Sequence, residues 1–174
     1  MPVIPIDVPA ESVLIRADRR LSFEVVSAFR SPTANLESIR VLDRWDDENR
    51  ILAEFSSPVP LLFNRVWTLK TIEAVTFIDP ERLEFELSEP TGILSLLEDR
   101  FVLEDVDGWT RFRYESRFGI SGWIFGWVIG KLLFERMFKQ HMRTHLDELK
   151  ETIEARASRS RTYPMPESDP PESR

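Results

Sequence analysis

The chain has 174 residues, which is the size of a single folded domain with room for a sizeable core. A hydrophobic content of 42% beside 30% charged residues is typical of a globular protein and excludes wholesale disorder. The net charge of -7 argues against a nucleic-acid partner, and the absence of cysteine excludes disulfides, thiolate metal sites and a cysteine nucleophile.

The two ends of the chain differ in composition from the middle. Residues 1–10 carry three prolines and no basic segment, which predicts an extended lead-in rather than a secretory signal. Residues 157–174 are rich in proline, serine and charge, and we expect a disordered tail there. The stretch between them, residues 11–156, shows no internal repeat or linker and is predicted to be one domain. The absence of cysteine and of a predicted secretory signal favours a cytoplasmic protein.

The first predicted elements are a strand and a helix. The apolar run "ESVLIRA" predicts a short strand, and Asp18 is placed to cap the helix "RRLSFEVVSAF" that follows it. Leu21, Val25 and Phe29 share one face of this helix, which Ser31-Pro32 should end. The segment "TANLESI" predicts a short second helix.

Three hairpins follow, because alternating apolar and polar residues flank three turn sequences. "IRVLDRW" and "RILAEF" flank "DDEN", "VWTLKTIEAVTF" and "LEFEL" flank "IDPER", and "DRFVLED" and "WTRFRYESRF" flank "VDG". A long C-terminal helix comes last. This order predicts an α+β fold in which helices cover one side of an antiparallel sheet.

The last predicted strand shows which side chains should face the helices. Its alternation places one set of residues inward, namely Phe112, Tyr114, Ser116 and Phe118. The intervening residues, which should face solvent, are Arg111, Arg113, Glu115 and Arg117.

Several of these segments resemble the START-like, or Bet v 1-like (SRPBCC), superfamily, including its polyketide cyclase/dehydrase-like members. The resemblance is carried by "VLIRADRRLSFEVVSAF", "TFIDPERLEFEL", "RFVLEDVDGWTRFRYESRF" and the terminal "HLDELKETIEAR", and it covers residues 11–156. It implies a helix-grip fold, in which a curved sheet of about six or seven antiparallel strands grips a long C-terminal helix. Such a resemblance in element order supports a fold more strongly than a function.

The C-terminal helix begins with an unusual segment in which Gly122, Gly126 and Gly130 recur every four residues among large apolar residues. The uncharged run is too short for a membrane span, which needs about 20 residues. A helix that is apolar on all sides needs partners on more than one side. The glycines serve either close packing against another backbone or space for a ligand. The resemblance favours the second explanation, since this helix closes an internal cavity in helix-grip proteins.

The two histidines, His141 and His145, lie one helical turn apart, a spacing that zinc helices use. Met142 stands where the zinc-protease motif requires a glutamate, and cysteine is absent as a third ligand. We therefore predict no metal and no cofactor. His145 falls instead on a predicted buried stripe, with Phe138, Met142, Leu149 and Ile153.

The function that these features favour is the binding or transport of a small hydrophobic ligand, such as a lipid, an isoprenoid or a polyketide-like aromatic molecule. The cavity is expected between the sheet and the C-terminal helix, with Lys131 or His145 meeting any polar group of the ligand. The predicted ligand-binding residues are Leu21, Val25, Phe112, Tyr114, Ser116, Phe118, Trp123, Trp127, Lys131 and His145.

Two alternatives stay open. One is a cyclase- or dehydratase-type enzyme that acts on such a ligand, for which the catalytic candidates are Glu73, Asp43, His145 and Tyr114. The other is a protein that docks on a membrane surface or a partner through its tryptophans and two apolar connections, "SPVPLLFNRVW" and "PTGILSLLED". In either case we expect a monomer or a weak homodimer.

Overall fold

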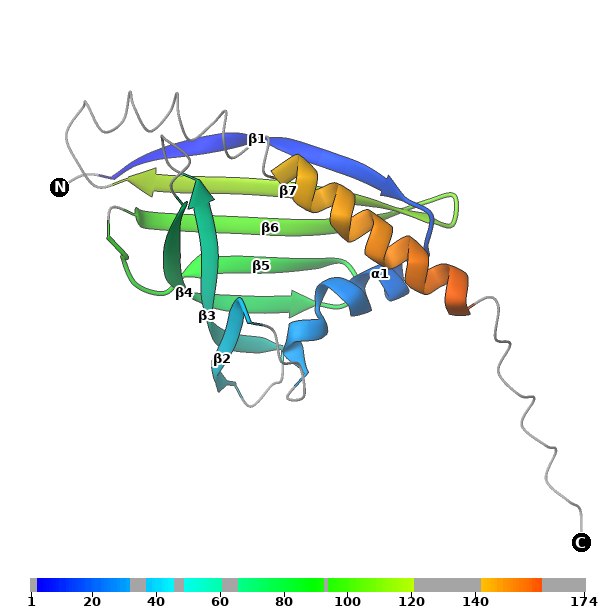
Figure 1. The fold of residues 1–174 in the computed structure, drawn as a ribbon, viewed down its shortest axis with the longest axis horizontal. Helices are drawn as coiled ribbons and strands as arrows, with labels where there is room; N and C mark the ends of the chain where they lie inside the picture. Colours follow the sequence, from blue (N-terminus) through cyan, green and yellow to red (C-terminus); the bar gives the residue numbers. More distant parts are fainter. Residues whose placement is uncertain are drawn as a thin grey trace, which may run out of the picture.

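The computed structural model describes residues 3–31, 37–45, 49–60, 66–92, 94–120 and 142–160. Its elements, in chain order, are β1 (Ile4–Ile15), α1 (Arg19–Val26), η1 (Ala28–Arg30), β2 (Ile39–Arg44), β3 (Arg50–Pro60), β4 (Val66–Ile78), β5 (Arg82–Leu87), β6 (Leu94–Val106) and β7 (Trp109–Ile120). Residues 142–160 form the described part of the C-terminal helix, drawn in orange in Figure 1.

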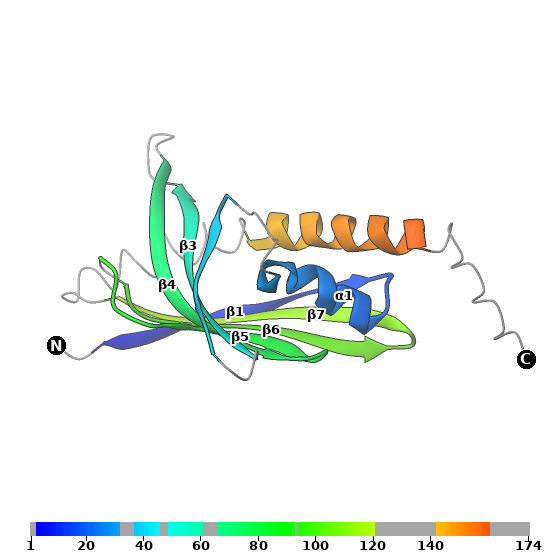
Figure 2. The ribbon, with the colours of Figure 1, turned by 90° about the horizontal axis from the view of Figure 1, so that it is seen from below.

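The strands form a seven-stranded antiparallel sheet in the order β1-β7-β6-β5-β4-β3-β2. The sheet curves, and α1 and the C-terminal helix both lie against its concave side (Figure 2). The three predicted hairpins are confirmed as β2-β3, β4-β5 and β6-β7. The predicted α+β architecture, with helices on one side of an antiparallel sheet, is therefore confirmed.

Several elements are longer than the sequence pattern indicated. β1 begins at Ile4, so most of the expected lead-in belongs to the sheet; its prolines are tolerated because β1 is an edge strand. Most of the apolar connection "PTGILSLLED" is likewise strand, since β6 begins at Leu94. At the other end the helix continues to residue 160, and Ala157, expected in the disordered tail, is buried. Most of the predicted helix "TANLESI" lies outside the described residues.

The helix α1 begins as the sequence predicted. The Leu21 N–H donates a hydrogen bond of 2.8 Å to Asp18 Oδ1, which caps the first turn. A buried polar contact then holds α1 to the sheet: Thr110 on β7 donates to the Ala17 carbonyl at 2.9 Å, and Ser22 Oγ lies 3.1 Å from Thr110 Oγ1. These bonds fix the position of α1 over one end of the concave face.

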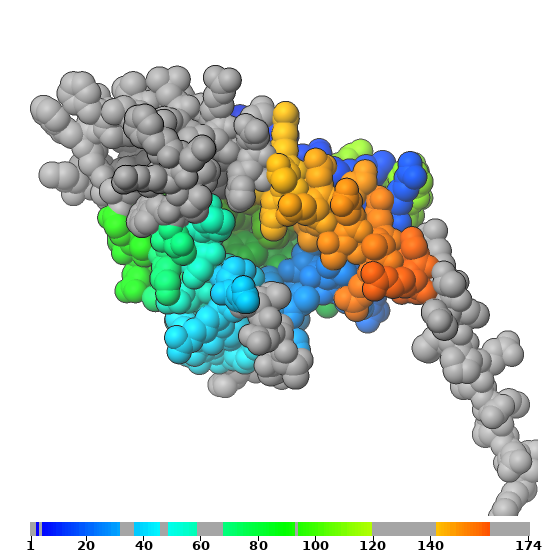
Figure 3. Space-filling view, in the orientation of Figure 1, coloured from blue at the N-terminus to red at the C-terminus, as the bar shows by residue number. Residues whose placement is uncertain are grey.

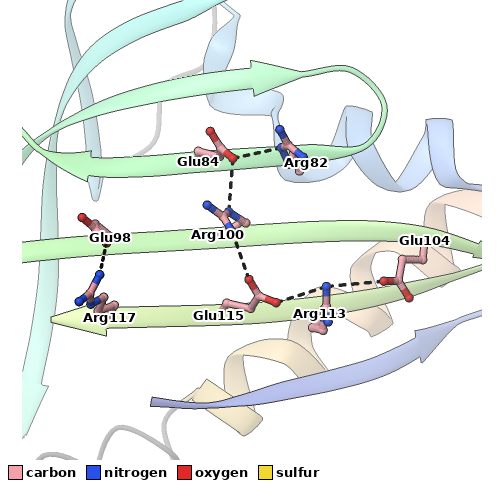
Figure 4. A network of polar contacts seen from close by, with 8 residues as sticks. All are labelled: Arg82, Glu84, Glu98, Arg100, Glu104, Arg113, Glu115 and Arg117. Carbon is pink, nitrogen blue, oxygen red and sulfur yellow. Dashed lines mark ion pairs between the residues drawn. The ribbon is translucent and has the colours of Figure 1, made fainter. Parts of the chain in front are cut away.

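The two faces of the sheet differ sharply in chemistry. On the concave face, aromatic rings from β3, β5, β6 and β7 pack in succession, with centroids 5.8 Å apart for Phe55–Phe85, 4.9 Å for Phe85–Phe101 and 5.3 Å for Phe101–Phe112. On the convex face, arginines and glutamates of β5, β6 and β7 form a ladder of ion pairs (Figure 4). The predicted alternation along β7 is therefore confirmed.

The ion-pair ladder connects each strand to its neighbours. Glu84 contacts Arg82 at 3.1 Å and Arg100 at 3.3 Å, and Arg113 contacts Glu115 at 3.2 Å. Exposed pairs of this kind add little stability individually. The pairs engage the arginines of these strands on the convex face, so these arginines do not enter the core.

Replacing Thr110 by valine tests the tie between α1 and the sheet. Thr110→Val keeps the side-chain volume but leaves the buried Ala17 carbonyl without its donor and removes the contact with Ser22, whose hydroxyl still donates to the Asp18 carbonyl. We therefore expect a loss of about 1–2 kcal/mol in the free energy of unfolding. Urea denaturation measures it. Thr68→Val, at an exposed position of β4, is the matched control and should change stability by less than about 0.5 kcal/mol. Equal effects of the two substitutions would contradict the assignment.

Candidate functional site

Five polar residues meet on the concave face, where the other buried side chains that the structure describes are apolar or belong to α1 and its contact with the sheet. We call this set the polar cluster: Thr71 and Glu73 from β4, Asp99 from β6, and Tyr114 and Ser116 from β7. The strand register explains how they meet. Asp99 lies directly opposite Ser116, and Tyr114 lies opposite Phe101, the inward-facing residue two positions beyond Asp99. Glu73 lies two strands away from Asp99, beyond β5.

Glu73 is the most buried carboxyl group of the described structure, with 6% of its surface exposed. The Thr71 hydroxyl donates a hydrogen bond to Glu73 Oε1. Burial raises the pKa of Glu73 to about 7; the bond from Thr71 lowers it in part, and the negative charge of Asp99 raises it further. Glu73 can therefore hold or release a proton near neutral pH.

Asp99 is the second carboxyl group of the cluster. Its side chain is half-buried, and Oδ1 is shut off from solvent without a hydrogen-bond partner. Burial raises the pKa of Asp99 to about 6, while the approach of the Ser116 and Tyr114 hydroxyls lowers it in part. The approach of Ser116 is not a well-aligned hydrogen bond, because Ser116 Oγ is itself buried and has no partner in the described structure.

Tyr114 supplies the third titratable group. Only 2% of its surface is exposed, and its ring packs 5.4 Å from that of Phe101. Burial raises the pKa of the Tyr114 phenol well above its ordinary value, and the charge of Asp99 adds to the effect. The phenol is therefore neutral at physiological pH and acts as a hydrogen-bond donor as well as an acceptor.

The polar cluster lies where two hydrophobic clusters meet. Tyr114 belongs to the larger cluster beneath the helices, and Phe118 belongs to a smaller one with Ile6 and Leu94. Ser116 lies between Tyr114 and Phe118 on the same face of β7. Leu69, Leu87 and Leu97 pack on the smaller cluster. A few polar groups in an apolar surround are typical of sites that orient a largely apolar ligand.

The predicted inward residues of β7, Phe112, Tyr114, Ser116 and Phe118, are all buried on the concave face. Leu21 and Val25 of α1 are half-buried and pack against the larger hydrophobic cluster. The remaining predicted lining residues, Trp123, Trp127 and Lys131, lie outside the described residues, as do the spaced glycines. That these side chains contact a ligand stays a prediction.

Two predicted site residues do not join the cluster. Asp43 is exposed and accepts a hydrogen bond of 2.8 Å from the Arg44 N–H, because a bulge between Val41 and Asp43 changes the register of β2. His145 is also exposed. The helix buries the stripe of Met142, Leu146, Leu149, Ile153 and Ala157 instead. His145 lies about 80° from the middle of that stripe at 100° per residue. His141 lies outside the described residues.

Asp99 is the site residue that the sequence analysis missed. The signal was present: in "LLEDRFVLED" the alternation that holds for β7 places Leu97, Asp99, Phe101 and Leu103 on one face. The acidic residues on both sides of Asp99 in the sequence, Glu98 and Glu104, belong to the outward ladder. In the sequence Asp99 therefore resembles its charged surface neighbours, and the pairing of β6 with β7 shows that it lies opposite the buried Ser116.

Glu73→Gln should make the protein more stable at alkaline pH. Below pH 4.5 the group is protonated in both the folded and the unfolded chain, whereas above about 7 the folded chain holds a buried charge. The free energy of unfolding of the wild type therefore falls as the pH rises from 4.5 to about 7, because the folded chain must ionise a buried carboxyl group. We expect the variant to gain about 1–3 kcal/mol over the wild type at pH 8, and little at pH 4.

Urea denaturation between pH 4 and pH 8 measures this difference. Glu86→Gln, at an exposed position of the neighbouring strand β5, is the matched control and should give curves parallel to those of the wild type. A Glu73→Gln variant whose stability relative to the wild type does not change with pH would show that Glu73 is not held in the buried environment described above.

Comparisons with known proteins agree with this geometry at the level of the fold. No protein-family model and no curated protein matches the sequence. Solved structures do. A protein from Thermus thermophilus has a TM-score of 0.67 at 18% identity, over 87% of this chain and 99% of that chain. The Zhui aromatase/cyclase from Streptomyces sp. R1128 has a TM-score of 0.67 at 13% identity, over 88% of this chain and 96% of that chain.

A third similar structure is a START superfamily protein from Mycobacterium smegmatis, with a TM-score of 0.59 at 12% identity, over 89% of this chain and 97% of that chain. These TM-scores show a shared fold, and the low identities leave function open. The match extends over 87–89% of this chain and nearly the whole of each of the three similar chains, so the likeness concerns the fold as a whole. The chain therefore has a helix-grip fold like that of the aromatase/cyclase and of the START superfamily protein.

Proposed function

We propose that this protein binds a small, largely apolar molecule between the concave face of the sheet and the C-terminal helix. The observation that carries the proposal is the polar cluster: Glu73 and Asp99 are held among apolar side chains at a cost in stability. Replacing buried charged groups by apolar residues of similar volume is often neutral or stabilising, so the fold alone does not require this cluster. A ligand that uses these groups explains why they are there.

The position of the cluster supports the same function. Helix-grip proteins, to which the chain is similar in fold, hold ligands on this side of the sheet. Ser116 Oγ and Asp99 Oδ1 are buried atoms without hydrogen-bond partners in the described structure. Leaving such an atom unsatisfied costs about 1–3 kcal/mol. A polar group of a ligand would recover part of that cost while the apolar body of the ligand packs on Leu69, Leu87 and Leu97.

A bound molecule should be released when the protein is purified under native conditions and then denatured. We expect mass spectrometry to find one apolar compound at near-stoichiometric amount. Leu69→Trp, which adds bulk to the smaller hydrophobic cluster, should lower the amount at least about tenfold. Lys70→Trp, at the next and exposed position of β4, should leave it unchanged. The absence of any compound from folded wild-type protein, or equal loss in both variants, would contradict the proposal.

A second candidate function is acid–base catalysis on the bound molecule, of the kind that cyclases and dehydratases carry out. The supporting observation is that the pKa of Glu73 lies at about 7, where a carboxyl group both gives and takes protons at physiological pH. Asp99 and Tyr114 both lie close enough to Glu73 for charge on one group to shift the pKa of another, so a proton donor and acceptors would face the same ligand.

Catalysis and binding are distinguished by Glu73→Gln. If Glu73 is a general base, turnover of the released compound should rise with pH to a plateau above about 7 and fall at least about 100-fold in the variant, while the compound still binds. If the protein only binds, incubation leaves the compound chemically unchanged. A compound that is turned over at the same rate by Glu73→Gln would exclude Glu73 as the catalytic residue.

The membrane-docking alternative rests on residues outside the described part of the chain, above all Trp123 and Trp127. Within the described part, no helix has both the length and the apolar character needed to cross a membrane. Neither observation favours docking over ligand binding.

A further inference from the structure

The polar cluster has negative groups on one side of the space it faces and, among the described residues, no positive group to match them. The basic residues of its strands point the other way. Lys70 on β4 contacts Glu54 at 3.3 Å, Arg100 on β6 contacts Glu84, and Arg113 on β7 contacts Glu115. Strand alternation fixes this separation, since each of these basic residues is an odd number of positions from Glu73, Asp99 or Tyr114 along its own strand.

The elements packed over the concave face do not supply a cation either, as far as they are described. The C-terminal helix contributes apolar Met142, Leu146 and Leu149 to the hydrophobic cluster that contains Tyr114. Its Arg143 pairs with Glu11 at the sheet edge, at 3.2 Å. The guanidinium of Arg30, on η1, lies 5.2 Å above the ring of Phe77.

Phe77 is two inward positions beyond Glu73 on β4, at about 13 Å along the strand. Arg30 is therefore too distant to pair directly with Glu73. Among the residues that the structure describes, the titratable groups that interact with Glu73 are Asp99 and Tyr114, and neither offers a positive charge to it.

Ser116 provides a separate reason to expect a ligand at this place. Its side chain is more than nine-tenths buried, lies directly opposite Asp99, and its Oγ has no hydrogen-bond partner in the described structure. A serine oxygen has two lone pairs and accepts hydrogen bonds readily. A ligand group bound against Asp99 would therefore also lie near Ser116 Oγ, its cross-strand neighbour.

The hydrogen bonds already present indicate what kind of group is still needed. The Thr71 hydroxyl donates to Glu73, and the hydroxyls of Tyr114 and Ser116 approach Asp99 as donors. The protein thus supplies donors to its own carboxyl groups, while Asp99 Oδ1 and Ser116 Oγ are left without a hydrogen-bond partner in the described structure. A primary ammonium group has three donors and no acceptor, and its charge is opposite to that of the carboxylates.

We propose that the polar cluster binds the protonated amine of an otherwise apolar ligand, with Glu73 and Asp99 as counter-charges and Ser116 Oγ as a neutral acceptor. The inference rests on the proposed function, since it names the chemical class of the ligand for the same site. A neutral ligand with only carbonyl oxygens would need both carboxyl groups protonated. A carboxylic acid ligand would add a third negative charge to the site and should be rejected.

Binding of a cation must also move protons. The positive charge lowers the pKa of both carboxyl groups, so the site releases protons when an amine binds between about pH 6 and pH 7. At pH 5 both groups are protonated in the free protein, and the amine then loses most of its advantage over a neutral ligand. A ligand that accepts hydrogen bonds from protonated carboxyl groups would cause proton uptake instead.

A series of naphthalene compounds of nearly equal size tests the charge preference directly. The probes are 1-naphthylmethylamine, 1-naphthylmethanol, 1-acetonaphthone and 1-naphthylacetic acid, each titrated into the full-length protein by calorimetry. At pH 7.5 we expect the amine to bind at least about tenfold more tightly than the alcohol or the ketone, and the acid most weakly. At pH 5 the amine and the alcohol should differ by less than about threefold. Titrations between about pH 6 and pH 7, in buffers of different ionisation enthalpy, should show proton release for the amine.

Two variants locate the preference. Glu73→Gln and Asp99→Asn should each reduce the ratio of amine to alcohol affinity at least about threefold. Both remove a buried charge, so their thermal unfolding at pH 7.5 should occur at or above the wild-type temperature. Glu86→Gln, at an exposed position of β5, should keep the wild-type ratio.

The outcomes separate this inference from the proposed function. If the alcohol or ketone binds at least as tightly as the amine at pH 7.5, or if the variants keep the amine preference, the amine inference is wrong and apolar ligand binding still stands. If no member of the series binds and no compound is released from the purified protein, both proposals fail. A preference for the amine that depends on pH and on both carboxyl groups supports both.

Discussion

The alternation of side chains across one covered antiparallel sheet is the constraint on which the rest of this structure depends. Strands β5, β6 and β7 alternate residues that face the helices with residues that form the ion-pair ladder on the opposite face (Figure 4). The space-filling view shows how closely the C-terminal helix and α1 cover the end of the concave side on which they lie (Figure 3). The basic side chains of these strands are kept out of the core, so the buried carboxyl groups face apolar surroundings.

Those carboxyl groups are the place where the protein departs from the arrangement that would be most stable. Glu73 and Asp99 lose hydration on folding, and the bonds from neighbouring hydroxyls compensate only in part, which is why both pKa values remain raised. Departures of this kind are characteristic of functional sites, where stability is given up for chemistry or recognition. The same feature makes binding, acid–base catalysis and the choice of a cationic ligand testable through pH.

Much of the fold could be predicted because its signals are local. The turns in "DDEN", "DPER" and "VDG" and the period of the strands identified all three hairpins, and Asp18 identified the start of α1. The site was predicted less completely. Tyr114, Ser116 and Glu73 were named, but a bulge displaces Asp43, the buried stripe of the C-terminal helix runs through Leu146 rather than His145, and Asp99 was not recognised. A shift of one position is enough to move a side chain from core to solvent.

The sequence by itself determined the elements, their order and the amphipathic character of β7, because these follow from short-range spacing and turn chemistry. The resemblance of its segments to helix-grip proteins added the architecture. Only the tertiary structure decided which carboxyl groups are buried together. Glu73 and Asp99 are 26 positions apart in the chain and come from strands that are not neighbours, so that their interaction depends on the register of β4, β5, β6 and β7 at once. No local pattern contains that information, because the electrostatic energy of a charge depends on what surrounds it in space.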